Sequence, residues 1–440
     1  GDCSLVVRGD GTAALHWESE DGAASPVKRP AVYVYNLPPQ LAGWYHHSEV
    51  DRSVEEFFHA RLLASEHRVA DGEDADFYFV PVDARKAGLG RSHHIPAAFE
   101  WIRKHFPWFD RSGGGDHLVV LVGDYGTYDH FGERSHIPPL IRNVTWLQHN
   151  GLTKHEPFFR PGKDVLVPPL QASATGFRPE LSPYFSQRGK ERNGALMFWA
   201  GSVSDRPASG TENVRKLVWE HHRASPGFKI VDTRKEGRVP DYEAQLGSAT
   251  FCLAPSGMSG FGWGRRTTLA ALYGCIPVII QDNTVDALEE LLDYSSFALR
   301  VPSSKIGELD KILAAVGPEQ VKEMQRQLEC VWPRWLFSTV VGRYGGETGA
   351  DGAIESVLET LRRRMDGEAL PAGKPCELLE ASKREEPCPE PRPAMMDKAV
   401  GGPHRRFGTH FWRAGGAVCH GESGERPCKA APAACRADQA

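Results

Sequence analysis

Two adjacent arginines follow a glycine-rich stretch in the middle of the chain. Ser256 to Gly264 contains four glycines among nine residues, and Arg265 and Arg266 come directly after it. Glycines let the backbone approach a ligand closely, and guanidinium groups bind phosphate and carboxylate. The alternative is a surface loop with two solvated arginines. The residues predicted to bind an anionic group are Ser256, Gly257, Gly260, Gly262, Trp263 and Arg266.

The segments on either side of this stretch predict a βαβ unit. Thr250 to Ala254 is an apolar strand, Arg265 to Tyr273 has helical spacing, and Ile276 to Ile280 is a second apolar strand. Such a unit places the glycines at a helix N-terminus, where unpaired N–H groups attract phosphate. Two arginines in the first helical turn oppose the helix dipole by about 0.3–1 kcal/mol each. A bound anion would offset that cost.

Three ligand classes compete for this turn. Gly260-x-Gly262 before a helix, with Asp282 after the next strand, suggests a dinucleotide, but the third glycine of that fingerprint falls on Arg265. A P-loop is excluded because no Gly-Lys-Ser/Thr ends the loop. A nucleotide-sugar site accounts for the glycines and the arginines together.

The same stretch resembles a known family. Ala249 to Pro255, the Gly-Phe-Gly-Trp turn, Arg266, Gly274 to Asn283 and Leu288 to Val301 are similar to the C-terminal block of exostosin-like glycosyltransferases (glycosyltransferase family 47). The resemblance implies an α/β protein of the GT-B type, with two Rossmann-like domains facing each other across a cleft. It also implies an inverting enzyme with a nucleotide-sugar donor, usually a UDP-sugar.

Further site residues are expected from this resemblance. Asp116 to Gly126 is similar to the family's strand that ends in an aspartate-aromatic-glycine, which makes Asp124 the first candidate for the catalytic base. Arg215, with Arg206 second, is expected near the donor diphosphate. One position departs from the family, because Leu269 stands where an acidic residue usually holds the donor ribose.

The chain divides into five expected regions. Residues 1–26 form a leader whose first four residues resemble the end of an EGF-like module, and 27–174 form an acceptor-side domain. Residues 175–193 are a linker, 194–365 the nucleotide-sugar domain with closing helices, and 366–440 a low-complexity, disordered tail. The helix expected over Ala353 to Arg364 should pack across the two domains.

Composition and short motifs bear on the expected partners, metal content and location of the protein. The 52 basic and 57 acidic residues give no argument for nucleic acid. Asp74-Ala75-Asp76 precedes a strand and is interpreted as a solvated strand start, so no metal is expected. Cys252 and Cys275 are expected as buried thiols. Asn143-Val144-Thr145, the odd number of nine cysteines and the resemblance favour the Golgi lumen, with an N-terminal membrane anchor outside this chain.

Two functions remain open. The first is an active transferase that takes a nucleotide-sugar donor and a glycan or glycoprotein acceptor. The second, favoured by Leu269, is a catalytically silent subunit that scaffolds an active partner in a homo- or heterodimer. Binding of nucleotide sugars and formation of product would separate the two.

Overall fold

A computed structural model describes most of the first 376 residues. The described residues are 3–7, 13–17, 29–42, 54–82, 93–121, 123–154, 159–170, 178, 181–184, 192–203, 213–256, 264–337, 352–368 and 375–376, with the backbone alone for 3–7, 13–17 and 134. Gly257, Gly260, Gly262 and Trp263 of the expected donor site lie outside them, as do Arg206 and residues 377–440 of the expected tail.

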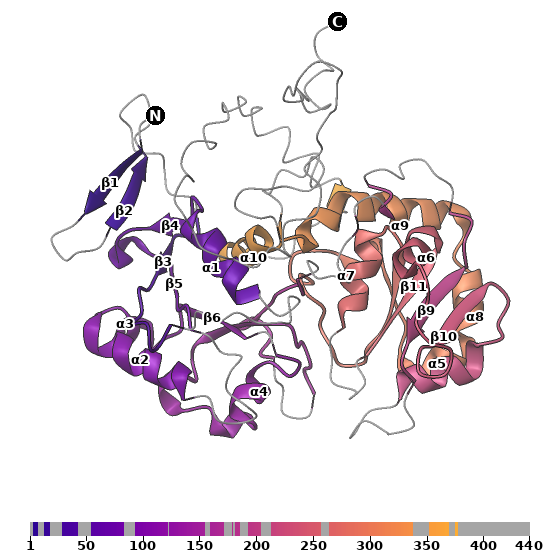
Figure 1. Cartoon of the computed structure of the whole chain (residues 1–440), viewed down its shortest axis with the longest axis horizontal. Coiled ribbons are helices and arrows are strands. Elements are labelled where there is room, and N and C mark those ends of the chain that lie inside the picture. The colour runs from indigo at the N-terminus through magenta and orange to yellow at the C-terminus, as the bar shows by residue number, and fades with distance from the viewer. Residues whose placement is uncertain are drawn as a thin grey trace, which may run out of the picture. The chain divides into compact units, whose positions relative to one another are not determined.

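The first domain is built on a six-stranded parallel sheet, coloured indigo to magenta in Figure 1. Its strand order is β4-β3-β5-β6-β7-β8. The strands are β3 (Val32–Val34), β4 (Arg68–Val69), β5 (Phe77–Phe79), β6 (His117–Leu121), β7 (Thr145–Gln148) and β8 (Val165–Leu166). The α-helices between them are α1 (Val54–Leu63), α2 (His94–His105), α3 (Phe109–Ser112) and α4 (Thr127–Phe131).

Alternation along β6 shows how this sheet is covered on both faces. Leu118 and Val120 join a core cluster with residues of α1, whereas Val119 and Leu121 join another with residues of α2. Successive side chains of a strand point to opposite faces, so each set meets a different helix layer. A parallel sheet buried on both sides explains the continuous apolar runs in the sequence.

The second domain contains a five-stranded parallel sheet of order β10-β9-β11-β12-β13. Its strands are β9 (Met197–Gly201), β10 (Phe228–Asp232), β11 (Phe251–Pro255), β12 (Ile276–Ile280) and β13 (Leu299–Arg300). Its α-helices are α5 (Val214–His222), α6 (Tyr242–Ser248), α7 (Arg265–Leu272), α8 (Leu309–Ala314) and α9 (Pro318–Val331). The expected βαβ unit is confirmed as β11, α7 and β12.

The chain then returns to the first domain through α10 (Ala353–Asp366). Ile354, Val357 and Leu361 of this helix belong to the core cluster of the first sheet. The expected helix over Ala353 to Arg364 is therefore confirmed. It packs on the core of the first domain and also contacts the second domain, where its Arg364 binds Glu290, as expected.

Near the N-terminus the backbone forms a two-stranded antiparallel ladder of β1 (Cys3–Val7) and β2 (Ala13–Trp17). This ladder lies in the segment expected as a leader.

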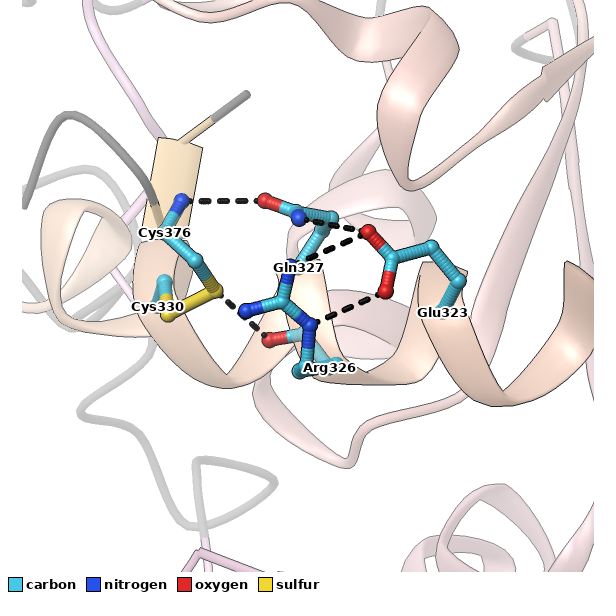
Figure 2. Close-up of a disulfide and its surroundings, with 5 residues drawn as sticks. All are labelled: Glu323, Arg326, Gln327, Cys330 and Cys376. Atoms are coloured by element: carbon cyan, nitrogen blue, oxygen red, sulfur yellow. Dashed lines mark hydrogen bonds and ion pairs between the residues drawn. A yellow bond between two sulfur atoms is a disulfide. The ribbon is translucent and has the colours of Figure 1, made fainter. Parts of the chain in front are cut away.

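Two disulfides tie these elements together. Cys252 of β11 is bonded to Cys275, just before β12, so the expectation of two buried thiols was wrong. The parallel register brings residue 252 opposite residue 277, a proximity that a separation of 23 residues in sequence does not reveal. Cys330 of α9 is bonded to Cys376, as Figure 2 shows, so the expected tail is attached to the second domain at this point.

Candidate active site

The second sheet has a topological switch point between β9 and β11. The first strand of the domain, β9, lies between β10 and β11. The chain therefore passes from β9 to β10 on one side of it and then crosses to β11 on the other side. Open α/β sheets bind ligands outside the carboxyl ends of the strands at such a point. In this domain that edge is formed by Gly201 at the end of β9 and by Pro255 and Ser256 at the end of β11.

Arg266 lies at this edge. Its Nη2 donates to the carbonyl oxygen of Ala200 at 2.6 Å, and its guanidinium carbon lies 5.6 Å from the ring centroid of Trp199. A Cβ atom on Gly201 would lie 2.6 Å from Nη2, so a larger residue there would displace the guanidinium group from this position. Nε is buried without a hydrogen-bond partner in the described part of the chain.

Arg215, from α5, reaches the same edge. Its Nε donates to the carbonyl oxygen of Ser256 at 3.1 Å. Burial, together with repulsion from the nearby Arg266, lowers the pKa of Arg215 to about 10. Within the described ranges, neither arginine has a carboxylate at ion-pair distance.

This arrangement favours a bound anion. Each guanidinium carries five N–H donors, whereas the hydrogen bonds observed for Arg215 and Arg266 go to single backbone carbonyls. Two like charges held close together in a partly buried site are costly unless an opposite charge joins them. An anion with several oxygens, such as a diphosphate, would satisfy both groups at once.

The start of α7 adds backbone donors to this edge. The helix begins at Arg265, and its N-cap, Gly264, supplies no side-chain cap. The first N–H groups of the helix are thus left for water or a ligand. Leu269, further along α7, is buried in the apolar core of the domain, so no carboxylate stands at its position.

In the first domain, Asp124 lies just beyond the carboxyl end of β6 and is exposed. Its carbonyl oxygen accepts a hydrogen bond from Nδ2 of Asn150 at 3.1 Å, and Asn150 follows the neighbouring strand β7. Gln148 Oε1 accepts from the amide of Thr127 in the next helix, α4. Side chains at the end of β7 and just after it therefore hold the loop that carries Asp124.

The loops that follow β7 and β12 join the two domains. Leu152 and Thr284 form an antiparallel bridge, the Thr153 amide donates to the Asn283 carbonyl at 2.9 Å, and the Val285 amide donates to the Gly151 carbonyl at 3.0 Å. A Cβ atom on Gly151 would lie 2.0 Å from the Val285 oxygen, so this approach requires glycine.

The contact between the loops after β7 and β12 forms a seam between the domains, and residues of both domains line a small cavity beside it. His149, Val167 and Pro169 contribute from the first domain, and Gly264, Thr267, Thr268 and Asp286 are among the residues from the second. His149 Nδ1 lies 2.7 Å from the Val167 carbonyl oxygen, so this nitrogen carries the ring proton. The cavity thus adjoins the first turn of α7.

Several polar residues at these edges were not predicted. They are Gln148, His149, Asn150, Asp232, Gln281 and Asp286. Each comes at the end of a strand or within a few residues of it. Position at a strand end could have identified them, but β7 was not predicted from the sequence, so Gln148, His149 and Asn150 could not be found in this way.

The other candidates have structural partners. Asp76 Oδ2 accepts from the Ala31 amide at 2.7 Å and its Oδ1 pairs with Arg29 at 2.5 Å, which agrees with the interpretation as a strand start. Asp282, which the dinucleotide hypothesis required, accepts hydrogen bonds from the amide and hydroxyl of Ser303. Among the described residues, no group of three His, Cys, Asp or Glu side chains could hold a metal ion. No helix in these residues is both long and apolar enough to span a bilayer.

Relatives of the chain are found among plant proteins. It is 27% identical over 352 residues to a protein of Oryza sativa subsp. japonica named "Probable glucuronosyltransferase", covering 73% of this chain and 80% of the relative. It is 28% identical over 328 residues to a protein of Arabidopsis thaliana named "Probable beta-1,4-xylosyltransferase", covering 69% of this chain and 75% of the relative.

Among solved structures, the chain is similar to AviGT4, a glycosyltransferase involved in avilamycin A biosynthesis. The alignment covers 78% of this chain and 99% of AviGT4, with 14% identity and a TM-score of 0.32. A likeness of that size carries no argument. The fold rests on the two doubly wound parallel sheets and on the family, because the Exostosin GT47 domain matches residues 26–316, well over half of the sequence. The chain therefore belongs to the exostosin GT47 family of glycosyltransferases.

Proposed function

We propose that the protein is an inverting glycosyltransferase that moves a sugar from a UDP-sugar to a glycan or glycoprotein acceptor. The observation that carries this proposal is the pair Arg215 and Arg266, two partly buried guanidinium groups at the switch point without a carboxylate partner in the described ranges. Their charge and position suit the diphosphate of a nucleotide sugar. No metal is part of the proposal, since the arginines and the start of α7 supply the positive charge.

The reaction assigns a role to each end of the site. The acceptor hydroxyl oxygen attacks the anomeric carbon from the face opposite the diphosphate, and the bond from that carbon to the diphosphate oxygen breaks. The diphosphate leaves with the bonding electron pair, and Asp124 takes the proton of the hydroxyl. Negative charge builds up on the leaving group, where Arg215, Arg266 and the α7 N–H groups stabilise it.

The disulfides favour the lumen of the secretory pathway as the place of action. Cys252–Cys275 and Cys330–Cys376 both lie within the folded part of the second domain. Disulfides persist in oxidising compartments and are rare in the cytosol. Together with the relatives' activity as sugar transferases, this supports the Golgi lumen as the location.

The test is calorimetric binding of UDP, followed by a panel of UDP-xylose, UDP-glucuronic acid and UDP-glucose. The first two sugars are those of the transferases that the relatives are named after. Arg266→Ala should raise the Kd of UDP about tenfold to a hundredfold, because charge-assisted hydrogen bonds contribute about 1.5–3 kcal/mol. Unchanged UDP binding would remove Arg266 from the site.

Arg223→Ala is the matched control. Arg223 follows the same helix as Arg215 but is exposed, with its guanidinium over the Trp219 ring, so UDP binding should stay at the wild-type level. Transfer is then followed by mass spectrometry with glycan acceptors. Donor binding without any product would favour the silent scaffolding subunit, for which Leu269 in the core is the structural argument.

A further inference from the structure

Four buried polar atoms without a hydrogen-bond partner lie along the carboxyl edge of the second sheet. They are Trp199 Nε1, Asp232 Oδ2, Arg266 Nε and Gln281 Oε1, and none has a partner in the described part of the chain. Most buried polar groups in proteins are hydrogen-bonded, so each exception calls for an explanation. Four exceptions at one edge indicate a ligand that completes them.

Asp232 is the last residue of β10 and is held rigidly. It is 1% exposed, and its Oδ1 accepts from the amides of Val203 at 3.0 Å and Arg234 at 3.1 Å. These two bonds fix the carboxylate and leave Oδ2 as the acceptor that lacks a donor. In register, Asp232 lies opposite Gly201, the residue against which Arg266 packs. A hydrogen-bond acceptor therefore stands next to the proposed diphosphate site.

Gln281 occupies the corresponding place after β12. It is 4% exposed, and its Nε2 donates to the Ala254 carbonyl at 3.2 Å, which turns Oε1 away from that oxygen. The strand order β10-β9-β11-β12 puts Asp232 and Gln281 three strand spacings apart, about 14 Å. The two arginines lie between them, at the ends of β9 and β11.

The strand order also indicates which way the donor lies along the edge from Asp232 to Gln281. The loop after β12 is bonded to the first domain through Thr284 and Leu152, whereas β10 is the outer strand of the sheet. The transferred sugar must meet an acceptor that is shared with the first domain, so it belongs at the β12 end. The nucleoside then belongs at the β10 end, where a carboxylate at a strand end suits a ribose hydroxyl.

We propose that Asp232 binds a ribose hydroxyl of the donor nucleotide and that Gln281 binds a hydroxyl of the transferred sugar. This inference rests on the proposed function and adds the orientation of the donor to it. Asp232 thereby supplies the carboxylate that Leu269, buried in the core, cannot provide.

Calorimetry with UDP, 2′-deoxy-UDP and 3′-deoxy-UDP tests the Asp232 contact. Wild-type protein should bind at least one deoxy analogue about tenfold more weakly than UDP, because a hydrogen bond to a charged acceptor is lost. Asp232→Asn keeps Oδ1 for the two amides but replaces the acceptor Oδ2 by an N–H₂ donor. It should weaken UDP binding by a similar factor and have no further effect on that deoxy analogue.

Gln281→Leu distinguishes the contact to the transferred sugar from the contacts to UDP. It should leave the Kd of UDP unchanged, which also shows that the variant is folded. It should raise about two- to tenfold the Kd of the UDP-sugar that wild-type protein binds best in the donor panel.

Three results would overturn the inference while the proposed function stands: wild-type protein that binds UDP and both deoxy analogues equally, Asp232→Asn with wild-type affinity for UDP, or Gln281→Leu that weakens UDP itself. The first two would mean that water alone fills the site at Asp232. Wild-type protein that binds neither UDP nor any UDP-sugar would reject the proposed function and this inference together.

Discussion

At the scale of single residues, Asp286 is a buried carboxyl group of the second domain. Its Oδ2 lies 3.0 Å from Arg300 Nη2, and its Oδ1 lies 3.4 Å from the Thr267 hydroxyl. Burial raises the pKa of this carboxyl to about 7, and the nearby Glu289 acts in the same direction, while Arg300 opposes both. The seam between the domains therefore contains an acid that can change its charge near neutral pH.

The protonation of Asp286 predicts a pH-dependent stability. An aspartate in the unfolded chain titrates near pH 4, so between about pH 4 and 7 the folded protein holds a proton that the unfolded chain has lost. This stabilisation is complete below about pH 4 and is lost as the pH rises through about 7. The melting temperature of wild type, relative to Asp286→Asn, should fall between about pH 4 and 7 and level off above pH 7. Parallel curves for the two proteins would contradict the prediction.

Asp124 carries a prediction about catalysis alone. Asp124→Asn removes the proposed proton acceptor, but the carbonyl that binds Asn150 remains. Transfer should fall by about a hundredfold or more, because a positioned base contributes about 10²–10⁴-fold. The Kd of UDP, bound in the other domain, should not change. Turnover at the wild-type rate in a coupled UDP-release assay would assign the base to another residue.

At the scale of elements, the βαβ unit was predictable because local signals agree there. The strand expected over Ile276 to Ile280 is β12 itself, and the helix expected from Arg265 is α7. By contrast, β7 is only four residues long and contains Thr145 and Gln148, so it has no apolar run to reveal it. The polar groups after β7 were missed for the same reason. The Cys252–Cys275 bond was missed because strand register is not encoded in sequence spacing.

The Cys330–Cys376 bond fixes the segment after α10 to the end of α9. Figure 2 shows Cys376 beside Gln327, whose Oε1 accepts from the Cys376 amide at 2.9 Å, while Sγ lies 3.2 Å from the Arg326 carbonyl oxygen. Helix α10 lies between Cys330 and Cys376 in the sequence and packs on the first sheet. The chain therefore runs from the second domain to the first, and the disulfide ties it back to the second. The disulfide thereby limits how far α10 can detach.

Removal of this disulfide should lower stability by a predictable amount. For a sequence separation of 46 residues, the chain-entropy model gives about 4 kcal/mol. Cys330→Ala with Cys376→Ala should therefore shift the urea midpoint to clearly lower concentration under oxidising conditions. With reductant, the wild type should move toward the double variant. Equal midpoints without reductant would show that the bond is not formed in the protein.

At the scale of the whole described fold, Arg364 of α10 connects both domains. Its Nε and Nη2 bind the Glu290 carboxylate at 2.8 and 2.5 Å, and its Nη1 and Nη2 donate to the carbonyls of Lys163 and Asp164 at 2.9 and 2.7 Å. Glu290 belongs to the second domain, and Lys163 and Asp164 precede β8 of the first. The sequence predicted that the helix over Ala353 to Arg364 packs across the two domains, but only the fold shows that one arginine of this helix binds groups on both sides.

Arg364 should therefore affect transfer without affecting donor binding. A two-domain site works only when the sugar held by one domain meets the acceptor held with the other, and misplacement of reacting groups is costly. Arg364→Ala removes charged hydrogen bonds that contribute about 1.5–3 kcal/mol each, so kcat/KM for transfer should fall about tenfold. The Kd of UDP should stay the same, because every proposed diphosphate contact lies within the second domain.

Arg362→Ala is the comparison that makes this test specific. Arg362 lies on the same helix, but its ion pairs are with Glu359, Asp366 and Glu368, on α10 or just after it. Loss of these contacts changes the helix surface and leaves the link between the domains intact, so kcat/KM should stay near wild type. If Arg362→Ala and Arg364→Ala reduced kcat/KM equally, the effect would come from α10 stability, and the link through Glu290 would have no part in placing the two halves of the site.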